Sequence, residues 1–416
     1  MTKTISLLSA ATFWMAPVAC VPGSPVAAAA KSGVTVSATD FIAASDGVSK
    51  KGSHVALESG QQWFSFDAEI PVTGRYRVEV SARADSDAGT ALNVEDYIHN
   101  KDGRNYDITS AMVPPAGSSF ATVSKDGSPL QAGTHQMKLV SNGGPVSVES
   151  VTFTLIKEHE LTPYTLKQNV EGDEWVLVWS DEFETDGPPD PKTWAYDFGN
   201  WGWGNREPQY YTENRLENAR CEGGRLIIEA RKDREDGGWS SARLTTRGRV
   251  SFLYGRIEIR AKVPATDGTW AAGWLLGDAY RDEVSWPYCG EIDILENVGR
   301  EIDDVTGDGR THFSCHTRAY YFKQNNHISV NKEVPGLGGK FHDYALEWTP
   351  AAVKIFLDGE HVYTYDKTAD ELEYPFNRPQ NLIINMAMGG GMGGEIDPSL
   401  ERERMEVEYL RVYGRQ

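Results

Sequence analysis

A two-residue alternation of apolar and polar side chains is the feature that most constrains how this chain can fold. In the segment 74–82, Tyr76, Val78 and Val80 share one face, and three charged side chains share the other. This pattern is typical of an antiparallel strand with one buried face and one face in water. Further strand-like segments lie at 134–140, 147–153, 225–230, 255–263 and 405–413. Because no long helical period interrupts them, we predict an all-β chain.

The chain has 416 residues, which is too long for one ordinary core and indicates two folded units. Residues 33–157 are punctuated by Gly, Pro, Asn and Asp, and this composition predicts a β-sandwich. The polar, charged segment 158–173 is typical of a linker. Residues 174–416 contain a second set of strands, for which we expect one larger β-sandwich.

Residues 1–30 have the composition of an export signal. Lys3 is followed by the apolar run 5–19, which is too short to cross a bilayer. Two processing routes stay open. Either Cys20, in a lipobox-like Val-Ala-Cys, is lipidated and anchors the chain to the outer membrane, or the chain is cleaved after the alanines 27–30. In both cases we expect an exported protein, extracellular or a cell-surface lipoprotein.

The formal net charge of −19, from 41 basic and 60 acidic residues, argues against a nucleic-acid partner because no basic surplus is available to neutralise phosphates. It favours a soluble protein with a neutral or cationic ligand, and we expect a monomer. The 12 Trp and 18 Tyr fit two roles, packing in β-sandwich cores and lining a sugar cleft. Cys221, Cys289 and Cys315 allow one disulfide with one free thiol, or no disulfide.

Three carboxylates lie close together in the sequence, at Glu291, Asp293 and Glu296. Because side chains alternate along a strand, Glu291 and Asp293 share a face, whereas Glu296 needs a β-bulge near 294–295 to join them. Repulsion splits the pKa values of clustered carboxyls, so that one stays ionised while another keeps its proton near neutral pH. Cleavage of a glycosidic bond requires such a nucleophile and proton donor. The alternatives are a solvated acidic edge strand or a calcium site.

The segments around these acids carry a resemblance to a known family. They are 177–183, 202–212, 241–248, 254–262, 268–274, 291–296, 344–350 and 405–413. Over residues 176–413 the chain resembles glycoside hydrolase family 16, specifically its laminarinase-like endo-β-1,3-glucanases. The resemblance implies a concanavalin-like β-jelly roll with a concave substrate cleft. It also implies a retaining endo-hydrolase that cleaves internal β-1,3-glucosidic bonds in laminarin-like glucans.

By this resemblance Glu291 is the nucleophile, Glu296 is the general acid/base, and Asp293 holds the nucleophile and tunes its charge. No cofactor is required for catalysis. The candidate substrate-binding residues are Trp203, Asn205, Arg247, Trp270, Trp274, Trp286 and His316. Glu207 matches a family position on or behind the cleft walls. Without the family, core packing would be the natural role of Trp270, Trp274 and His316. A solvated surface role stays open for Glu207 and Arg247.

The segment 389–394 departs from the family. It places Met392 among glycines, where laminarinases usually have Asn-Trp between glycines. An aromatic platform near the bond-cleavage region is therefore missing, although the catalytic acids are untouched. Mixed-linkage β-glucan or a marine galactan is accordingly the alternative substrate of the same machinery. A non-catalytic glucan-binding protein is a further alternative, which the presence of both Glu291 and Glu296 argues against.

The family often carries a structural calcium on its convex side. The matching positions are Glu182, Gly224 and Glu408, the last of which is usually Asp. A longer Glu can still reach a flexible oxygen site, so the resemblance implies a possible structural calcium there. Plain salt bridging is the alternative.

The N-terminal block resembles carbohydrate-binding module family 6 and its galactose-binding-like relatives, through the segments 60–66, 70–76 and 132–140. Two parts of that pattern are replaced, the acidic start by 37–40 and the Asn-rich binding stretch by 143–148. By the resemblance Tyr97, Tyr106 and Trp63 are candidates for stacking on sugar rings. Buried packing is the alternative for Trp63.

Overall fold

The computed structural model describes residues 33–97 and 105–416. The expected export signal, residues 1–30, and its Cys20 lie outside the described residues. Within the described ranges, none of the helices has the length and apolar character needed to span a bilayer.

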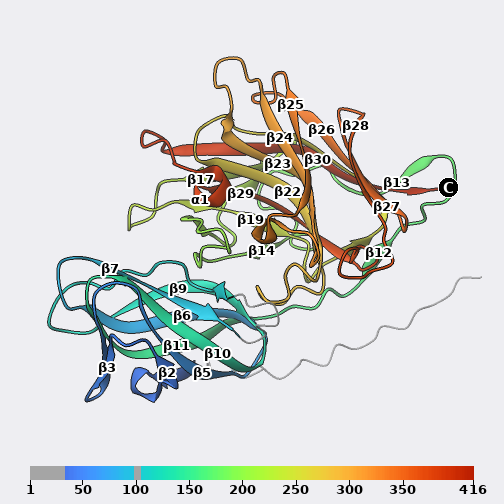
Figure 1. Ribbon diagram of the computed structural model, residues 1–416. Helices are drawn as coiled ribbons and strands as arrows, with labels where there is room; N and C mark the ends of the chain where they lie inside the picture. The colour runs from blue at the N-terminus through green and yellow to red at the C-terminus, as the bar shows by residue number, and fades with distance from the viewer. Residues whose placement is uncertain (1–32, 98–104) are drawn as a thin grey trace, which may run out of the picture.

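Two sheets built from residues 33–158 pack face to face and form what we call the N-terminal sandwich (Figure 1). The six-stranded sheet has the order β3-β4-β11-β6-β9, with β1 beside β11; its strands are β1 (Gly33–Ser37), β3 (Val48–Lys51), β4 (His54–Leu57), β6 (Gly74–Ala84), β9 (Ala121–Leu130) and β11 (Val146–Glu158). The five-stranded sheet has the order β2-β5-β10-β7-β8; its strands are β2 (Ala43–Ala44), β5 (Gln62–Ile70), β7 (Thr90–Asp96), β8 (Tyr106–Asp107) and β10 (Gly133–Gly143). A short 3-10 helix, η1 (Ala38–Asp40), follows β1.

The core of the N-terminal sandwich lies between these sheets. Phe64 and Phe66 of β5 meet Tyr76 of β6 and Phe153 of β11, and none of the four is more than 1% exposed. The strand β6 alternates buried and partly exposed residues along its length, as its sequence pattern predicts.

Two larger sheets form the C-terminal sandwich (Figure 1). The nine-stranded sheet has the order β12-β20-β29-β22-β23-β24-β25, with β14 and β19 attached; its strands are β12 (Thr165–Lys167), β14 (Ala195–Asp197), β19 (Arg243–Thr245), β20 (Ser251–Leu253), β22 (Thr269–Gly277), β23 (Glu291–Ile302), β24 (Gly309–His316), β25 (Ile328–Val334) and β29 (Gln380–Met388). The ten-stranded sheet has the order β15-β18-β17-β30-β21-β26-β27-β28, with β13 and β16 attached; its strands are β13 (Trp175–Asp181), β15 (Tyr210–Tyr211), β16 (Ala219–Cys221), β17 (Leu226–Arg231), β18 (Ser240–Ser241), β21 (Gly255–Lys262), β26 (His342–Trp348), β27 (Ala352–Leu357), β28 (Glu360–Asp366) and β30 (Arg402–Arg415). The helices η2 (Phe322–Gln324) and α1 (Gly390–Gly393) are single short turns.

The burial of individual strands explains where a site can form. The strand β21 alternates between buried and partly exposed residues, so one of its faces packs on the core. In β29 all nine residues are buried, because loops cover the face that points away from the core. The jelly-roll sandwich therefore carries covering segments on the outer face of its nine-stranded sheet, where β22, β23 and β29 lie.

The segment 158–173, expected as a linker, contains a strand. β12 pairs in parallel with β20, and Thr162 Oγ1 donates a hydrogen bond to Asp278 Oδ1 at 2.6 Å. The connection between the two sandwiches is thus bound to the C-terminal sandwich over part of its length.

Cys221, Cys289 and Cys315 are all free and buried. Of the two possibilities left open by the sequence, the structure has no disulfide among these three residues. Cys289, 3% exposed, packs with Leu276 and Tyr321 as a small apolar side chain beside the acidic strand.

Candidate active site

A cleft on the outer face of the nine-stranded sheet brings together acids and aromatic rings. The acids Glu291, Asp293 and Glu296 come from β23. The aromatic side chains that line the cleft with them are Trp201, Trp203, Trp270, Trp274, Tyr280, Trp286 and Phe322. Ring faces beside carboxyl groups suit a sugar, which presents apolar C–H faces and polar edges.

A β-bulge places all three acids on one face of β23. Opposite β22, Trp274 pairs with Asp293 and Gly273 pairs with Leu295, so Ile294 is an extra residue on β23. The register with β24 also shifts, between Asp293 and Glu296. Ile294 and Leu295 are fully buried in the core, whereas Glu296 returns to the cleft. The bulge predicted from the spacing of the acids is confirmed.

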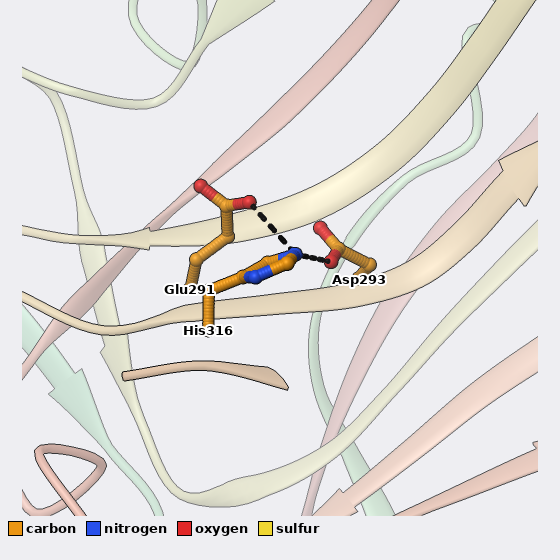
Figure 2. A group of neighbouring side chains, drawn as sticks. All are labelled: Glu291, Asp293 and His316. Atoms are coloured by element: carbon orange, nitrogen blue, oxygen red, sulfur yellow. Dashed lines mark ion pairs between the residues drawn. The ribbon is translucent and has the colours of Figure 1, made fainter. Parts of the chain in front are cut away.

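Each carboxyl group has a defined partner, and Figure 2 draws Glu291 and Asp293 beside His316. Trp286 Nε1 donates to Glu291 Oε2 at 2.9 Å, and Trp270 Nε1 donates to Glu296 Oε1 at 3.1 Å. His316 Nε2 lies 3.3 Å from Asp293 Oδ2 and 3.7 Å from Glu291 Oε1. The hydroxyl of Ser314 donates to the same oxygen of Asp293.

Burial and charge set the protonation of this group. Burial, with a further contribution from the charge of Asp293, raises the pKa of Glu291 to about 7 and that of Glu296 to about 8. Burial alone would lower the pKa of His316, but its hydrogen bond with Asp293 and the charge of Glu291 raise it to about 9. At neutral pH the site therefore holds an imidazolium next to Glu291, and Glu296 is the carboxyl that keeps its proton most readily.

The side chains drawn in Figure 2 are also of the types that bind metal ions. One ligand atom each of Glu291, Asp293 and His316 lies within 4.8 Å of the others. A metal ligand must be a neutral imidazole, however, and the raised pKa of His316 favours the protonated form. The donor set therefore fits an ion-paired histidine better than a bound cation.

Comparisons with known proteins identify the family of the chain. The family model for glycosyl hydrolases family 16 matches residues 206–411. A beta-glucanase of Rhodothermus marinus is 45% identical over 249 residues, which covers 58% of this chain and 85% of that protein. The chain belongs to glycosyl hydrolases family 16.

Two solved structures of the family are similar in fold. The laminarinase of Rhodothermus marinus has 44% identity and a TM-score of 0.53, and the match covers 58% of this chain and 98% of that one. A non-specific endo-β-1,3(4)-glucanase, crystallised with 1,3-β-D-cellotriosyl-glucose, has 37% identity and a TM-score of 0.54 over 60% of this chain and 98% of that one.

Two predicted tryptophans, Trp270 and Trp274, lie on β22 and line the family-16 cleft. Both are only partly buried, and the side chain of Trp274 donates from Nε1 to Asn385 Oδ1 at 2.8 Å. They are not core residues. Trp286 lines the cleft as well, at 8% exposure, with its ring 5.9 Å from that of His316.

Trp203 and Asn205 lie on a glycine-rich loop at the cleft edge, and both line it. The loop needs positive φ at Trp203 (55°) and at the neighbouring Gly202 and Gly204. Asn205 Nδ2 donates to Glu207 Oε1 at 3.2 Å. Burial raises the pKa of Glu207 to about 7, so this residue is a buried acid of the cleft wall and not a solvated surface residue.

Arg247 is placed differently from the other candidates. It is buried behind the cleft, where its Nη1 lies 3.4 Å from Asp197 Oδ1 and its guanidinium lies 5.2 Å from the ring centre of Tyr280. The arginine that lines the cleft is Arg243, four residues earlier. Sequence reasoning missed Arg243, together with Asn385, although Arg243 belongs to the quoted motif 241–248.

The segment with the missing aromatic forms α1 beside Asn205. Gly391 N donates to the backbone oxygen of Asn205 at 3.0 Å, and a Cβ on Gly390 would lie 3.0 Å from Glu207 Cγ. Gly390 also has a positive φ of 66°. Glycine thus allows this turn to close onto the loop, and Met392 within the turn is half-buried.

The positions implied for calcium carry arginine partners. Arg411 donates to both oxygens of Glu182 at 2.9 Å, and Arg260 Nε donates to Glu408 Oε2 at 2.7 Å. These guanidinium groups occupy the carboxylate oxygens and add positive charge, which does not fit a cation site formed with Gly224. Salt bridging accounts for both carboxylates, and calcium stays an untested prediction.

Proposed function

We propose that this family-16 protein is a retaining endo-1,3-β-glucanase that hydrolyses internal bonds of laminarin-like glucans. The observation that carries the proposal is the bulged strand β23. It turns Glu291, Asp293 and Glu296 toward one tryptophan-lined cleft, and it gives the last of them the most strongly raised pKa. The solved laminarinase of Rhodothermus marinus, 44% identical, supports the choice of substrate.

The chemistry follows from the two unequal glutamates. Ionised Glu291 attacks the anomeric carbon while protonated Glu296 donates its proton to the departing glycosidic oxygen. Glu296, now ionised, then takes a proton from a water molecule, whose oxygen attacks the anomeric carbon and breaks the bond between that carbon and Glu291. His316 and the indole of Trp286 hold the carboxylate of Glu291 ionised and oriented. No cofactor is needed for these steps.

Digestion of laminarin tests the proposal directly. Purified protein should release oligosaccharides from laminarin, and the first product seen by proton NMR should be the β-anomer, because two inversions give net retention. Glu291→Gln should lower the rate by at least about a thousandfold. Release of the α-anomer first, or full activity of Glu291→Gln, would contradict the assignment of the nucleophile. A protein that binds laminarin without cleaving it would be a non-catalytic glucan-binding protein.

A second substrate has a specific observation in its favour. The segment 389–394 lacks an aromatic platform, and a similar solved enzyme is described as a non-specific endo-β-1,3(4)-glucanase. We therefore include mixed-linkage β-glucan as the alternative substrate, and a marine galactan as a further alternative. The ratio of kcat/KM on laminarin to that on mixed-linkage glucan shows which of these two glucans is preferred. Digestion of agarose tests the galactan.

For the N-terminal sandwich we propose the role of a family-6-like carbohydrate-binding module. Trp63 and Tyr97 are partly exposed and stand on either side of Lys138, at 4.2 and 4.7 Å from its Nζ to each ring centre. Tyr106, 4% exposed, is not available for stacking. Retardation of the protein in a gel containing laminarin, compared with Trp63→Ala in a Glu291→Gln background, tests this role.

Export and oligomeric state are further proposals that rest on the sequence. We propose that the mature protein is an exported monomer that is either anchored through a lipidated Cys20 or released by cleavage after 27–30. Labelling of wild type and Cys20→Ser with a palmitate analogue distinguishes the two routes. Light scattering of the purified protein tests the monomer.

A further inference from the structure

A buried ion cluster joins the N-terminal sandwich to the cleft. Arg75 of β6 reaches Asp197 of β14, with 2.8 Å between Nη2 and Oδ1. The two side chains are only 12% and 6% exposed. Because charges withdrawn from water are stable only when they are paired, this contact is unlike the exposed ion pairs on the rest of the surface.

Asp197 binds two further arginines, both from the C-terminal sandwich. Its Oδ2 lies 3.2 Å from Arg243 Nε, and its Oδ1 lies 3.4 Å from Arg247 Nη1. Burial alone would raise the pKa of Asp197, but Arg75, Arg247 and Arg243 together hold it well below its usual range. The carboxylate is therefore ionised at every working pH and fixes three guanidinium groups at once.

Arg243 carries this constraint into the cleft. Its guanidinium carbon lies 4.8 Å from the ring centre of Trp203 and 4.7 Å from that of Trp274, so it stands between two cleft tryptophans. Arg75 itself lies 5.8 Å from the ring centre of Trp203. Stacking of a guanidinium on an indole restricts the ring, and the ion pair of Arg243 Nε with Asp197 holds the guanidinium in this position.

Backbone contacts strengthen the same junction. Asn200 N donates to the backbone oxygen of Asp126 at 3.0 Å, and Asp126 N donates to Asn200 Oδ1 at 3.0 Å. A Cβ on Gly127 would lie 2.1 Å from the backbone oxygen of Phe198, so only glycine permits this approach. Residues 198–200 lead directly into the loop that bears Trp203.

We propose that the N-terminal sandwich is a structural part of the substrate cleft, and that Arg75 is a positioning residue which holds Arg243, Trp203 and Trp274 in place for the glucan chain. The proposal rests on the proposed function only for the identity of that polymer. It assigns the N-terminal sandwich a role that does not require this sandwich to bind sugar itself.

The first test compares Arg75→Met with Arg83→Met in the full-length protein. Arg83 lies on the same strand and pairs with Asp85, 3.0 Å away, inside the N-terminal sandwich, so it is a matched control. Arg75→Met should raise KM for laminarin by about three- to tenfold and leave kcat within about twofold, because a charge-assisted contact that orients the cleft is lost while the acids stay in place. Arg75→Lys should restore part of the loss, and Arg83→Met should change neither constant.

The second test does not depend on activity. Hydrogen exchange of the peptides covering 198–207 should be faster in Arg75→Met than in wild type and unchanged in Arg83→Met. Unchanged exchange and unchanged KM in Arg75→Met would overturn the proposal. If wild type fails to cleave laminarin, the proposed function fails, while the exchange comparison still decides on the positioning role. Should Arg75→Met not fold, Asn200→Ala removes the hydrogen bond that Asn200 Oδ1 accepts from Asp126 N, and it is judged by the same two measurements.

Discussion

At the scale of single residues, the charge on His316 affects the pKa values of the two catalytic glutamates. Its raised pKa of about 9 keeps it positive at neutral pH, and this charge lowers the pKa of both Glu291 and Glu296. Asp293 raises both, so the two neighbours act in opposite directions on the same carboxyls. The balance leaves Glu291 ionised at a lower pH than Glu296, which is the order that the proposed chemistry needs.

His316→Gln removes that positive charge. The pKa of Glu291 should then rise, and the acid limb of the kcat/KM profile on laminarin should move to higher pH by about one unit. His327→Gln is the control. The ring of His327 stacks on His316 at 5.7 Å, but burial and the charge of His316 lower its pKa, so it is neutral when the enzyme works. An acid limb that stays in place in His316→Gln would contradict the role of the imidazolium.

Glu207 supports a prediction about stability at alkaline pH. Burial raises its pKa from 4.5 to about 7 in the folded protein. Its contribution to stability is therefore fully present below pH 4.5 and is lost as the pH rises through 7. Glu207→Gln cannot ionise, so its Tm should exceed that of wild type by a few degrees, on the order of 2–4 °C per kcal/mol, at alkaline pH. Calorimetry in acidic and alkaline buffer checks this, with exposed Glu217→Gln as the variant that should show no such difference.

At the scale of elements, the strand β23 shows how far sequence reasoning reaches. Alternation places Glu291 and Asp293 on one face, and the odd spacing to Glu296 requires a bulge, which the register shows at Ile294. Strand alternation did not predict which of Arg243 and Arg247 lines the cleft. They share one motif, and only the end of β19 and the turn after it decide which side chain enters the cleft.

The turn α1 offers a place to restore an aromatic platform. Met392→Trp should lower KM for laminarin by a factor of about three, because a ring at the cleft edge adds on the order of 0.5–1 kcal/mol of stacking with a sugar. Met392→Leu, which is apolar and not aromatic, should behave as wild type. Equal KM values for the Trp and Leu variants would mean that residue 392 does not reach the polymer.

At the scale of the whole molecule, the two sandwiches are tied together at a point that sequence patterns do not reveal. Arg75 and Asp197 are 122 positions apart, and no sequence motif contains both residues. Strand alternation predicts that Arg75 leaves the core of its own sandwich. Which carboxylate it contacts depends on how the two sandwiches pack against each other. That packing produces no periodic pattern in the sequence.

Asp197→Asn tests this coupling through unfolding. The depressed pKa of Asp197 means that its stabilisation is present above pH 3.8 and is lost as the pH falls below that value. At pH 7 wild type should melt in one calorimetric transition, whereas Asp197→Asn should melt in two, because about 3–5 kcal/mol of coupling is lost when buried arginines are left without their partner. Asp85→Asn, which affects a pair inside the N-terminal sandwich, should keep a single transition.

The three buried cysteines have a consequence for how the protein is made. Burial raises the pKa of Cys221 to about 12, and it raises the pKa of Cys289 and Cys315 as well, so none of these thiols forms a reactive thiolate near neutral pH. Maturation of this part of the chain then needs no oxidising compartment and no disulfide isomerase. Synthesis in a reducing cytoplasm, or refolding in dithiothreitol, should give the same specific activity as secretion, so production is not limited by oxidative folding.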